Sequence, residues 1–354
     1  MKNIKEMRRI TAIVVIFGLL AMMFYPILAI WSTAAEGAEE AYIPDPDLEA
    51  VIREAIDKPY GPIYVEDLEG LTGLNAGNAG FHRSGIVIAD LTGLEYCTDL
   101  EYLDLRGNEI TDISPLSQLV NLEKLWLACN KITDLSPLSH LVNLKELWLQ
   151  GNKITDLSPL SHLVNLKELW LGENKITDLS PLSQLVNLKE LRLTWNEITD
   201  ISPLSHQVNL KELALEDNQI TDISPLSHLV NLELLVLEGN EITDISPLSH
   251  LVNLKRLYLG ENKITDLSPL SHLVNLGSLG LEDNEITDIS PLSQLVNLEW
   301  LHLENNEISS IAPLVANSGL SDCDTVYLTG NPLSKTSIKV YIPQLEERRV
   351  IVKW

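Results

Sequence analysis

Hydrophobic and polar residues alternate along this chain in a unit that repeats every 22 residues. Within residues 144–154, Leu147 and Leu149 alternate with Glu146, Trp148 and Gln150. This period of two predicts a short strand with one face toward a core and the other toward solvent. Ten units follow one another without an insertion, and their first leucines are Leu100, Leu122, Leu144, Leu166, Leu188, Leu210, Leu232, Leu254, Leu276 and Leu298.

The remainder of each unit predicts a turn and a short helical segment. Asn152 ends the strand, and we expect its side chain to bond backbone groups of the next coil. Ser158 before Pro159 predicts an N-cap and the first position of a helical turn. The fold class that follows is an α/β solenoid of about twelve coils, a leucine-rich-repeat horseshoe with a parallel β-sheet on the concave face and short helical turns on the convex face.

Two residues interrupt the apolar core row. Cys97 stands where later units have leucine, and we interpret it as a small buried hydrophobic residue. Gln207 stands where the neighbouring units have Leu185 and Leu229, which predicts a polar intrusion and a weak coil.

The ends of the array predict caps, because one coil cannot fold alone and the outer coils need cover. Residues 43–57 indicate a helix with Asp45 as N-cap and Pro46 at its first position, followed by irregular coils. After Asn331, residues 337–349 predict a closing helix and residues 350–354 a final strand. We divide the chain into an N-terminal segment 1–40, a helical N-terminal cap 41–68, a repeat array 69–314, and a last coil with C-terminal cap 315–354.

The N-terminal segment predicts export. Four basic residues within positions 2–9 precede the uncharged stretch 10–31. That stretch is long enough to span a bilayer, yet Pro26 and the small residues 32–38 resemble a cleavage region. A membrane anchor and a cleaved signal peptide both remain open, with membrane contact only through residues 10–31 if they are retained. In both cases we expect the protein at the cell surface or secreted.

Charge and motifs exclude several function classes. Fifty acidic residues against 25 basic ones give a net charge of −25, which argues against nucleic-acid binding and favours cationic or neutral partners. The sequence contains no GxSxG, HExxH or phosphate-loop motif. His302 and Glu304 face the same way on one strand, and we interpret them as neighbours rather than an acid–base pair. We predict that the protein is not an enzyme and has no cofactor.

Two polar columns lie on the predicted convex side. One column consists of His140, His162, His206, His228, His250 and His272. Glutamine replaces histidine at the same position of three other units, so we predict no metal site there. The second column begins with Asp112, Asp134 and Asp156, and we expect each aspartate to bond its own turn.

The outward strand positions vary between units while the rest hardly changes. Neighbouring strands lie about 4.8 Å apart, so Trp126, Trp148 and Trp170 should form one contiguous, solvent-facing aromatic row on the concave face. A binding role and simple inheritance through duplication both explain the row. The candidate ligand-binding residues are Trp126, Trp148, Trp170, Arg192, Trp195, Glu216, Glu238, Tyr258, Glu282, Trp300, His302 and Glu304.

Charge is unevenly placed along the concave face. Glu216, Glu238, Glu282 and Glu304 make the C-terminal half acidic, which fits a basic partner surface or an ordinary solvated face. Two hypotheses follow. The first is a protein ligand anchored on the tryptophans, since Trp is a favoured interface anchor; the second is a glycan stacked on the indole faces.

The repeat N-L-x-x-L-x-L-x-x-N-x-I-T-D-I-S-P-L-S-x-L-V resembles that of the internalin-like leucine-rich-repeat proteins of bacteria, over about residues 68–333. The helical segment before the repeats is also similar to theirs. The resemblance implies extracellular protein binding without specifying a ligand. The sequence contains no LPxTG-type sorting motif, so we do not expect covalent attachment to a cell wall.

Overall fold

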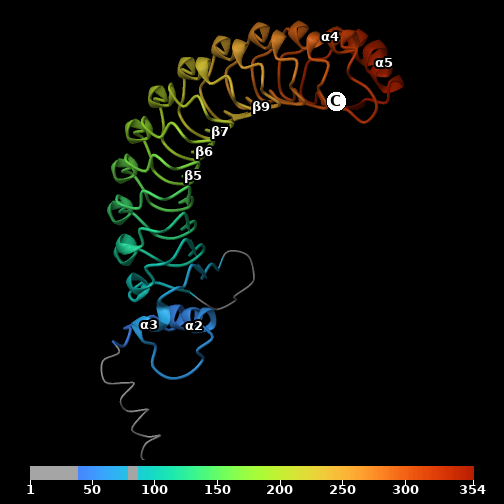
Figure 1. Cartoon of the computed structure of the whole chain (residues 1–354). Helices are drawn as coiled ribbons and strands as arrows, with labels where there is room; N and C mark the ends of the chain where they lie inside the picture. Colours follow the sequence, from blue (N-terminus) through green and yellow to red (C-terminus); the bar gives the residue numbers. More distant parts are fainter. Residues whose placement is uncertain (1–38, 79–86) are drawn as a thin grey trace, which may run out of the picture.

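The computed structural model describes residues 39–78 and 87–354. The chain forms an arch in which the strands line the inner side and the short helical turns line the outer side (Figure 1). This is the leucine-rich-repeat solenoid that the sequence predicts, with the sheet on the concave face.

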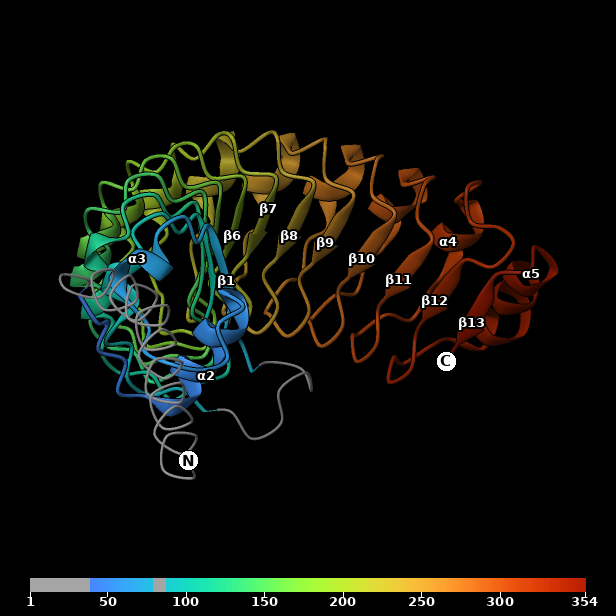
Figure 2. The same cartoon turned by 60° about the horizontal axis from the view of Figure 1, so that its bottom comes forward.

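One sheet of 13 parallel strands runs through the described residues in chain order. Figure 2 shows the later strands side by side. In register, Leu125 lies beside Leu147 and Leu147 beside Leu169, so each leucine of a strand stacks on its counterpart in the next coil. The strands are β1 (Gly73–Asn75), β2 (Tyr102–Asp104), β3 (Lys124–Trp126), β4 (Glu146–Trp148), β5 (Glu168–Trp170), β6 (Glu190–Arg192), β7 (Glu212–Ala214), β8 (Leu234–Val236), β9 (Arg256–Tyr258), β10 (Ser278–Gly280), β11 (Trp300–His302), β12 (Thr325–Tyr327) and β13 (Ile351–Lys353).

Short 3-10 turns cover the convex side. The prediction that Ser158 caps such a turn is wrong: Ser158 is itself the first residue of its turn, and its side chain makes no capping bond. Asp156 does this work, because its carboxylate accepts a 2.8 Å bond from the Ser158 amide and a further bond from its hydroxyl. The turns are η1 (Leu94–Tyr96), η2 (Ser114–Gln118), η3 (Ser136–Leu138), η4 (Ser158–Leu160), η5 (Ser180–Leu182), η6 (Ser202–Leu204), η7 (Ser224–His228), η8 (Ser246–His250), η9 (Ser268–His272) and η10 (Ser290–Gln294).

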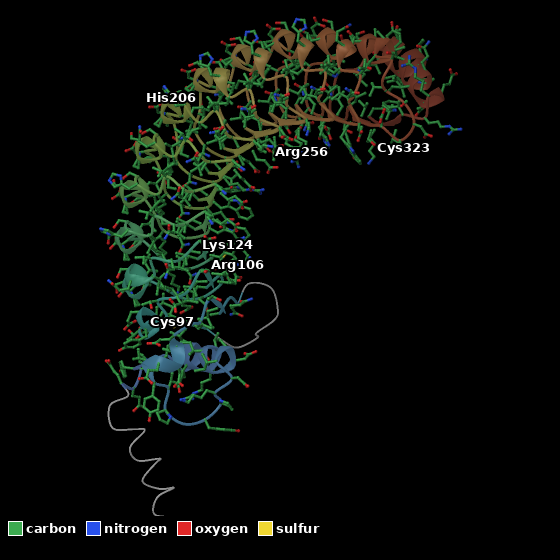
Figure 3. The ribbon with its side chains drawn as sticks, in the orientation of Figure 1. Cys97, Arg106, Lys124, His206, Arg256 and Cys323 are labelled. Atoms are coloured by element: carbon green, nitrogen blue, oxygen red, sulfur yellow. The ribbon has the colours of Figure 1, made fainter. Side chains whose placement is uncertain are left out.

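The same arrangement recurs down the aspartate column, which confirms that each aspartate bonds its own turn. The histidine column lies on the outer side of the arch, as His206 shows in Figure 3.

Two ladders of asparagines tie each coil to the one before it. Asn152 accepts a bond from the Ile132 amide and donates to the Leu127 carbonyl, both in the preceding coil. The expectation of bonds to the next coil is therefore wrong in direction, because the turn of the preceding coil presents its free backbone groups to this side chain. In the second, exposed ladder, Asn165 donates to the Val142 carbonyl, again one coil back.

Leucine and isoleucine fill the space between sheet and turns in one continuous core. Cys97 is fully buried in it, as predicted. Gln207 is also fully buried. Its Nε2 donates a 2.8 Å bond to the Leu182 carbonyl, while Oε1 has no hydrogen-bond partner among the described residues. The sequence prediction of a polar intrusion is confirmed.

Helices lie at both ends of the array. The predicted first helix is present as α2 (Pro46–Ala55), with Asp45 accepting bonds from the amides of Asp47 and Leu48. A short helix α3 (Val65–Leu68) follows, and α2 contacts β1. After α4 (Ala312–Ala316), the closing helix consists of a π-helical turn η11 (Ser337–Tyr341) continued by α5 (Ile342–Glu347). The predicted final strand is β13, which pairs with β12. The capping role of these ends and the domain boundaries stay predictions.

The predicted signal peptide or anchor, within residues 1–38, lies outside the described residues. Among residues 39–78 and 87–354, no helix has the length and apolar character needed to cross a membrane.

Candidate binding surface

The three tryptophans of the early coils form a tightly stacked column. Strand pairing sets Trp126 directly beside Trp148 and Trp148 directly beside Trp170. Their ring centroids are 4.3 Å and 4.1 Å apart, with interplanar angles of 8° and 2°. Parallel strands about 4.8 Å apart place equal side chains one above the other, a spacing that suits offset face-to-face stacking. The predicted contiguous row is present.

An arginine lies against the outer tryptophan at each end of the column, and Arg106 also lies 5.4 Å from the Trp148 centroid. The guanidinium carbon of Arg106 lies 4.5 Å from the Trp126 ring centroid, and that of Arg192 lies 4.5 Å from the Trp170 centroid. Such contacts are attractive because the ring faces carry negative charge density. We call Arg106, Trp126, Trp148, Trp170 and Arg192 the Trp–Arg ladder.

Acidic residues hold the two arginines in place. Asp104 accepts two bonds from Arg106, at 3.0 Å from Nε and 2.7 Å from a terminal nitrogen. Glu190 accepts a 2.6 Å bond from Arg192 Nε. Two-point pairing fixes a guanidinium in orientation as well as position, so the end of the ladder at Arg106 is preorganised.

The ladder is less open to solvent than the sequence predicts. All three tryptophans are partly buried, and their Nε1 atoms are buried without a hydrogen-bond partner among the described residues. Each inner ring face is covered by the next ring. The Arg106 guanidinium lies beside the stack, within reach of both Trp126 and Trp148, and Arg192 lies against Trp170. The ladder therefore presents ring edges and guanidinium groups on the concave face, while the indole faces between stacked rings are occupied.

The other two candidate tryptophans lie apart from the ladder. Trp195 is in the turn after β6 with a left-handed φ of 55°, and it is 60% exposed. Trp300 occupies the first position of β11, beside Ser278 and Thr325, and is 49% exposed. The five tryptophans do not form one patch. Tyr258, also a candidate, lies between these regions and shares a 3.1 Å hydrogen bond with Ser278.

Glutamates crowd together on the C-terminal half of the face. Burial, followed by the charge of Glu282 and a hydrogen bond between the two carboxyl groups, raises the pKa of Glu238 to about 7. Burial also raises the pKa of Glu216, with a contribution from Asp217 and Glu261. Since charge is lost where carboxylates crowd, the acidic half carries less negative charge near neutral pH than its composition indicates.

Two glycines make room for this crowding. A Cβ added at Gly260 would lie 2.8 Å from the carboxyl carbon of Glu282, and one at Gly280 would lie 3.2 Å from its Oε2. The side chain of Glu282 thus lies across the bare backbone of adjacent strands and reaches toward Glu238.

His302 lies in a second, shorter aromatic stack. Its ring is 4.3 Å from that of Tyr327 at an angle of 13°, and Lys353 Nζ lies 4.6 Å from the Tyr327 centroid. His302 Nδ1 is 3.4 Å from Oε1 of Glu304. The imidazole is therefore fixed from one side by stacking and from the other by a carboxylate.

Three features of this surface escaped the sequence analysis. Arg106 stands two residues after Asp104, which holds the position equivalent to Trp126 in the next coil. A comparison of equivalent positions therefore misses Arg106, whereas a comparison that includes the next outward position of the adjacent coil finds it. Tyr327 pairs with His302 across an interval of 25 residues, which the period of 22 does not reach. The importance of Gly260 follows only from where the Glu282 side chain goes.

Comparison with known protein families identifies the repeat. The model described as leucine rich repeats (2 copies) matches residues 98–206, 208–250 and 252–294, more than half of the chain. A search of curated proteins finds no significant match.

Solved structures show the same architecture. An internalin (InlF) from Listeria monocytogenes is 38% identical, with a TM-score of 0.82; the alignment covers 90% of this chain and 94% of that one. Internalin C2 from the same organism is 36% identical over 63% of this chain and 98% of its own, with a TM-score of 0.59. The plant peptide hormone receptor RGFR1, solved in complex with RGF2, is 22% identical with a TM-score of 0.64, over 75% of this chain and 45% of that chain, a likeness of fold alone.

Proposed function

Since the chain belongs to the internalin-like leucine-rich-repeat proteins, whose fold is a protein-binding module, we propose that it is exported and recognises a protein ligand through its concave face. The observation that carries the proposal is the Trp–Arg ladder, a preorganised group of large side chains on the curved sheet. Solenoids of this kind use their extended concave surfaces for binding.

The ladder has the composition of an interface hot spot. Tryptophan and arginine are the residues most enriched among positions that dominate binding energy. Here Asp104 and the neighbouring rings already fix Arg106 and Trp126, so a ligand need not order them. Less ordering at the interface means less entropy lost on association.

The stacking of the indole faces on one another favours a protein ligand over a glycan ligand. A sugar ring would stack on a free indole face, yet the faces of Trp148 lie 4.3 Å and 4.1 Å from the rings on either side. The ring edges and the guanidinium groups that remain suit apolar side chains and the carbonyl groups of a polypeptide. The acidic half adds a region that complements lysine or arginine on the same partner.

Binding of the labelled full-length protein to intact cells tests the proposal. Cells are used before and after their surface proteins are removed by protease. The key variant is Trp126→Ala/Trp148→Ala/Trp170→Ala. A matched control is Val142→Ala/Val164→Ala/Val186→Ala, which removes apolar surface that is exposed outside the strands in the same coils.

The expected result is binding that protease treatment abolishes, that the tryptophan variant lacks, and that the valine variant retains. Binding that survives protease treatment but fails in the tryptophan variant would identify a glycan ligand instead. Equal binding by all three proteins would refute a role for the ladder. Circular dichroism of each variant checks that it is folded.

A further inference from the structure

Three potential metal ligands meet near the C-terminal end of the concave face. Glu282, His302 and Glu304 each offer one ligand atom, and these atoms all lie within 4.8 Å of one another. His302 is the last residue of β11, Glu304 is two residues further on and faces the same way, and Glu282 comes from the coil before. The group combines one imidazole with two carboxylates.

The separations suit a small transition-metal ion. A tetrahedral zinc ion with bonds of about 2.0–2.1 Å places two of its ligand atoms about 3.3–3.4 Å apart. His302 Nδ1 and Glu304 Oε1 are 3.4 Å apart. That distance is long for a hydrogen bond but matches two ligands of one ion.

One oxygen of each carboxylate has no partner on the described chain, although the Glu282 carboxyl also shares a hydrogen bond with Glu238. Oε2 of Glu282 and Oε2 of Glu304 are both buried, and neither has a hydrogen-bond partner among the described residues. No lysine or arginine in that part of the chain forms an ion pair with either glutamate; His302 is the only basic partner there, for Glu304. Buried carboxylate oxygens without partners are costly, so a cation bound between them would stabilise them.

The ligands are fixed before any ion arrives. Tyr327 stacks on the His302 ring, and Lys353 lies over Tyr327. Gly260 and Gly280 leave the space in which Glu282 lies, since a Cβ at Gly260 would be 2.8 Å from its carboxyl carbon. Rigid strands and locked side chains are what a metal site requires of its scaffold.

We propose that Glu282, His302 and Glu304 form a zinc-binding site with a fourth coordination position open to the concave face. An imidazole with two carboxylates suits zinc, whereas calcium takes six to eight oxygen ligands and magnesium keeps several waters. The open position can accept water or a carboxylate or imidazole of a bound protein. This last role rests on the proposed function; the metal site itself does not.

Metal titration of the full-length protein tests the site directly. The protein is stripped with EDTA, dialysed, and titrated with zinc chloride in a calorimeter, with calcium and magnesium chloride as separate titrants. Cobalt chloride serves as a spectroscopic probe, because four-coordinate cobalt absorbs visible light much more strongly than six-coordinate cobalt. We expect one tight zinc ion per chain and no comparable binding of calcium or magnesium.

Variants assign the ion to these residues. Glu282→Gln and His302→Gln should each weaken zinc binding at least tenfold and abolish the cobalt spectrum. His206→Gln, which removes an imidazole from the convex column, is the matched control and should change neither. Both concave residues are partly exposed, so their variants should fold, which thermal unfolding in EDTA verifies.

Zinc binding that is equally strong in Glu282→Gln, His302→Gln and the native protein would overturn the proposal, as would the absence of tight zinc binding. Loss of binding in His206→Gln alone would place the ion in the convex column. These measurements involve no ligand, so they can succeed when the cell-binding experiment fails, and the reverse.

Discussion

Replacing Gln207 by leucine should stabilise the protein. Gln207 is fully buried in a row where the neighbouring coils carry Leu185 and Leu229, both fully buried as well. Its amide nitrogen donates to the Leu182 carbonyl at 2.8 Å, but its carbonyl oxygen has no hydrogen-bond partner in the described part of the chain. The surroundings repeat from coil to coil, so they already fit a leucine.

The magnitude follows from three contributions. Removing a buried carbonyl oxygen without a partner gains about 1–3 kcal/mol, and losing the single hydrogen bond costs about 1 kcal/mol. The Leu182 carbonyl keeps its bond from the Leu185 amide, so no backbone group loses its last partner. The larger apolar side chain contributes up to about 1 kcal/mol more, roughly one buried methylene. We expect the free energy of unfolding to rise by about 2 kcal/mol.

Urea denaturation followed by circular dichroism measures the change, and hydrogen exchange locates it. We expect Gln207→Leu to raise the midpoint without changing the slope, and to slow amide exchange in the coils around residues 185–229. The mirror variant Leu229→Gln introduces the same side chain one coil later and should lower stability by a similar amount. A native protein as stable as Gln207→Leu would contradict the reasoning, because the glutamine oxygen would then have a partner.

Three further predictions concern the tryptophans of the Trp–Arg ladder, the asparagine ladders and Glu238. Trp148→Ala should abolish the near-ultraviolet dichroism of coupled indoles, while Trp195→Ala, which removes an isolated ring, should leave it in place. Asn174→Ala leaves the buried Ile154 amide without its side-chain partner and removes one of the two asparagine donors to the Leu149 carbonyl, so it should lower the free energy of unfolding by about 3 kcal/mol in urea titrations. The exposed Asn165→Ala should lower it by less than about 1 kcal/mol. Because the pKa of Glu238 is about 7 in the folded protein against a usual 4.5, the folded state holds a proton between these values that the unfolded state releases, so stability falls as pH rises through that window. Melting temperatures in EDTA should therefore show Glu238→Gln gaining on the native protein at pH 8, with the gain vanishing below pH 4.5.

Much of the fold could be predicted because the repeat has no insertions. With a constant period, one strand assignment places every other strand, so the alignment of Trp126, Trp148 and Trp170 follows from counting. The same counting placed Gln207 in the core and the aspartates in their turns.

Side-chain conformation limited the prediction of the site. Whether the indoles face solvent or one another depends on the ring rotamers. The positions of the Arg106 and Arg192 guanidinium groups beside the rings depend on their bonds to Asp104 and Glu190. Ser158 and Asp156 are both residue types that favour the start of a helical turn. Residue preference alone predicts Ser158 as the cap, whereas the Asp156 carboxylate accepts the bonds. The contact between Glu282 and Glu238 depends on Gly260, because a Cβ at that position would lie 2.8 Å from the carboxyl carbon of Glu282.

The direction of the asparagine ladders has a consequence for how the molecule is made. Each asparagine hydrogen-bonds backbone groups of the coil before it. Asn152 accepts from the Ile132 amide and donates to the Leu127 carbonyl, and Asn331 does the same for Ile308 and Leu303. A chain emerging from the ribosome therefore leaves its newest coil with unsatisfied backbone groups until the following residues arrive. The front of ordered structure must trail synthesis by one coil, and a truncated product would always end in an unfinished one.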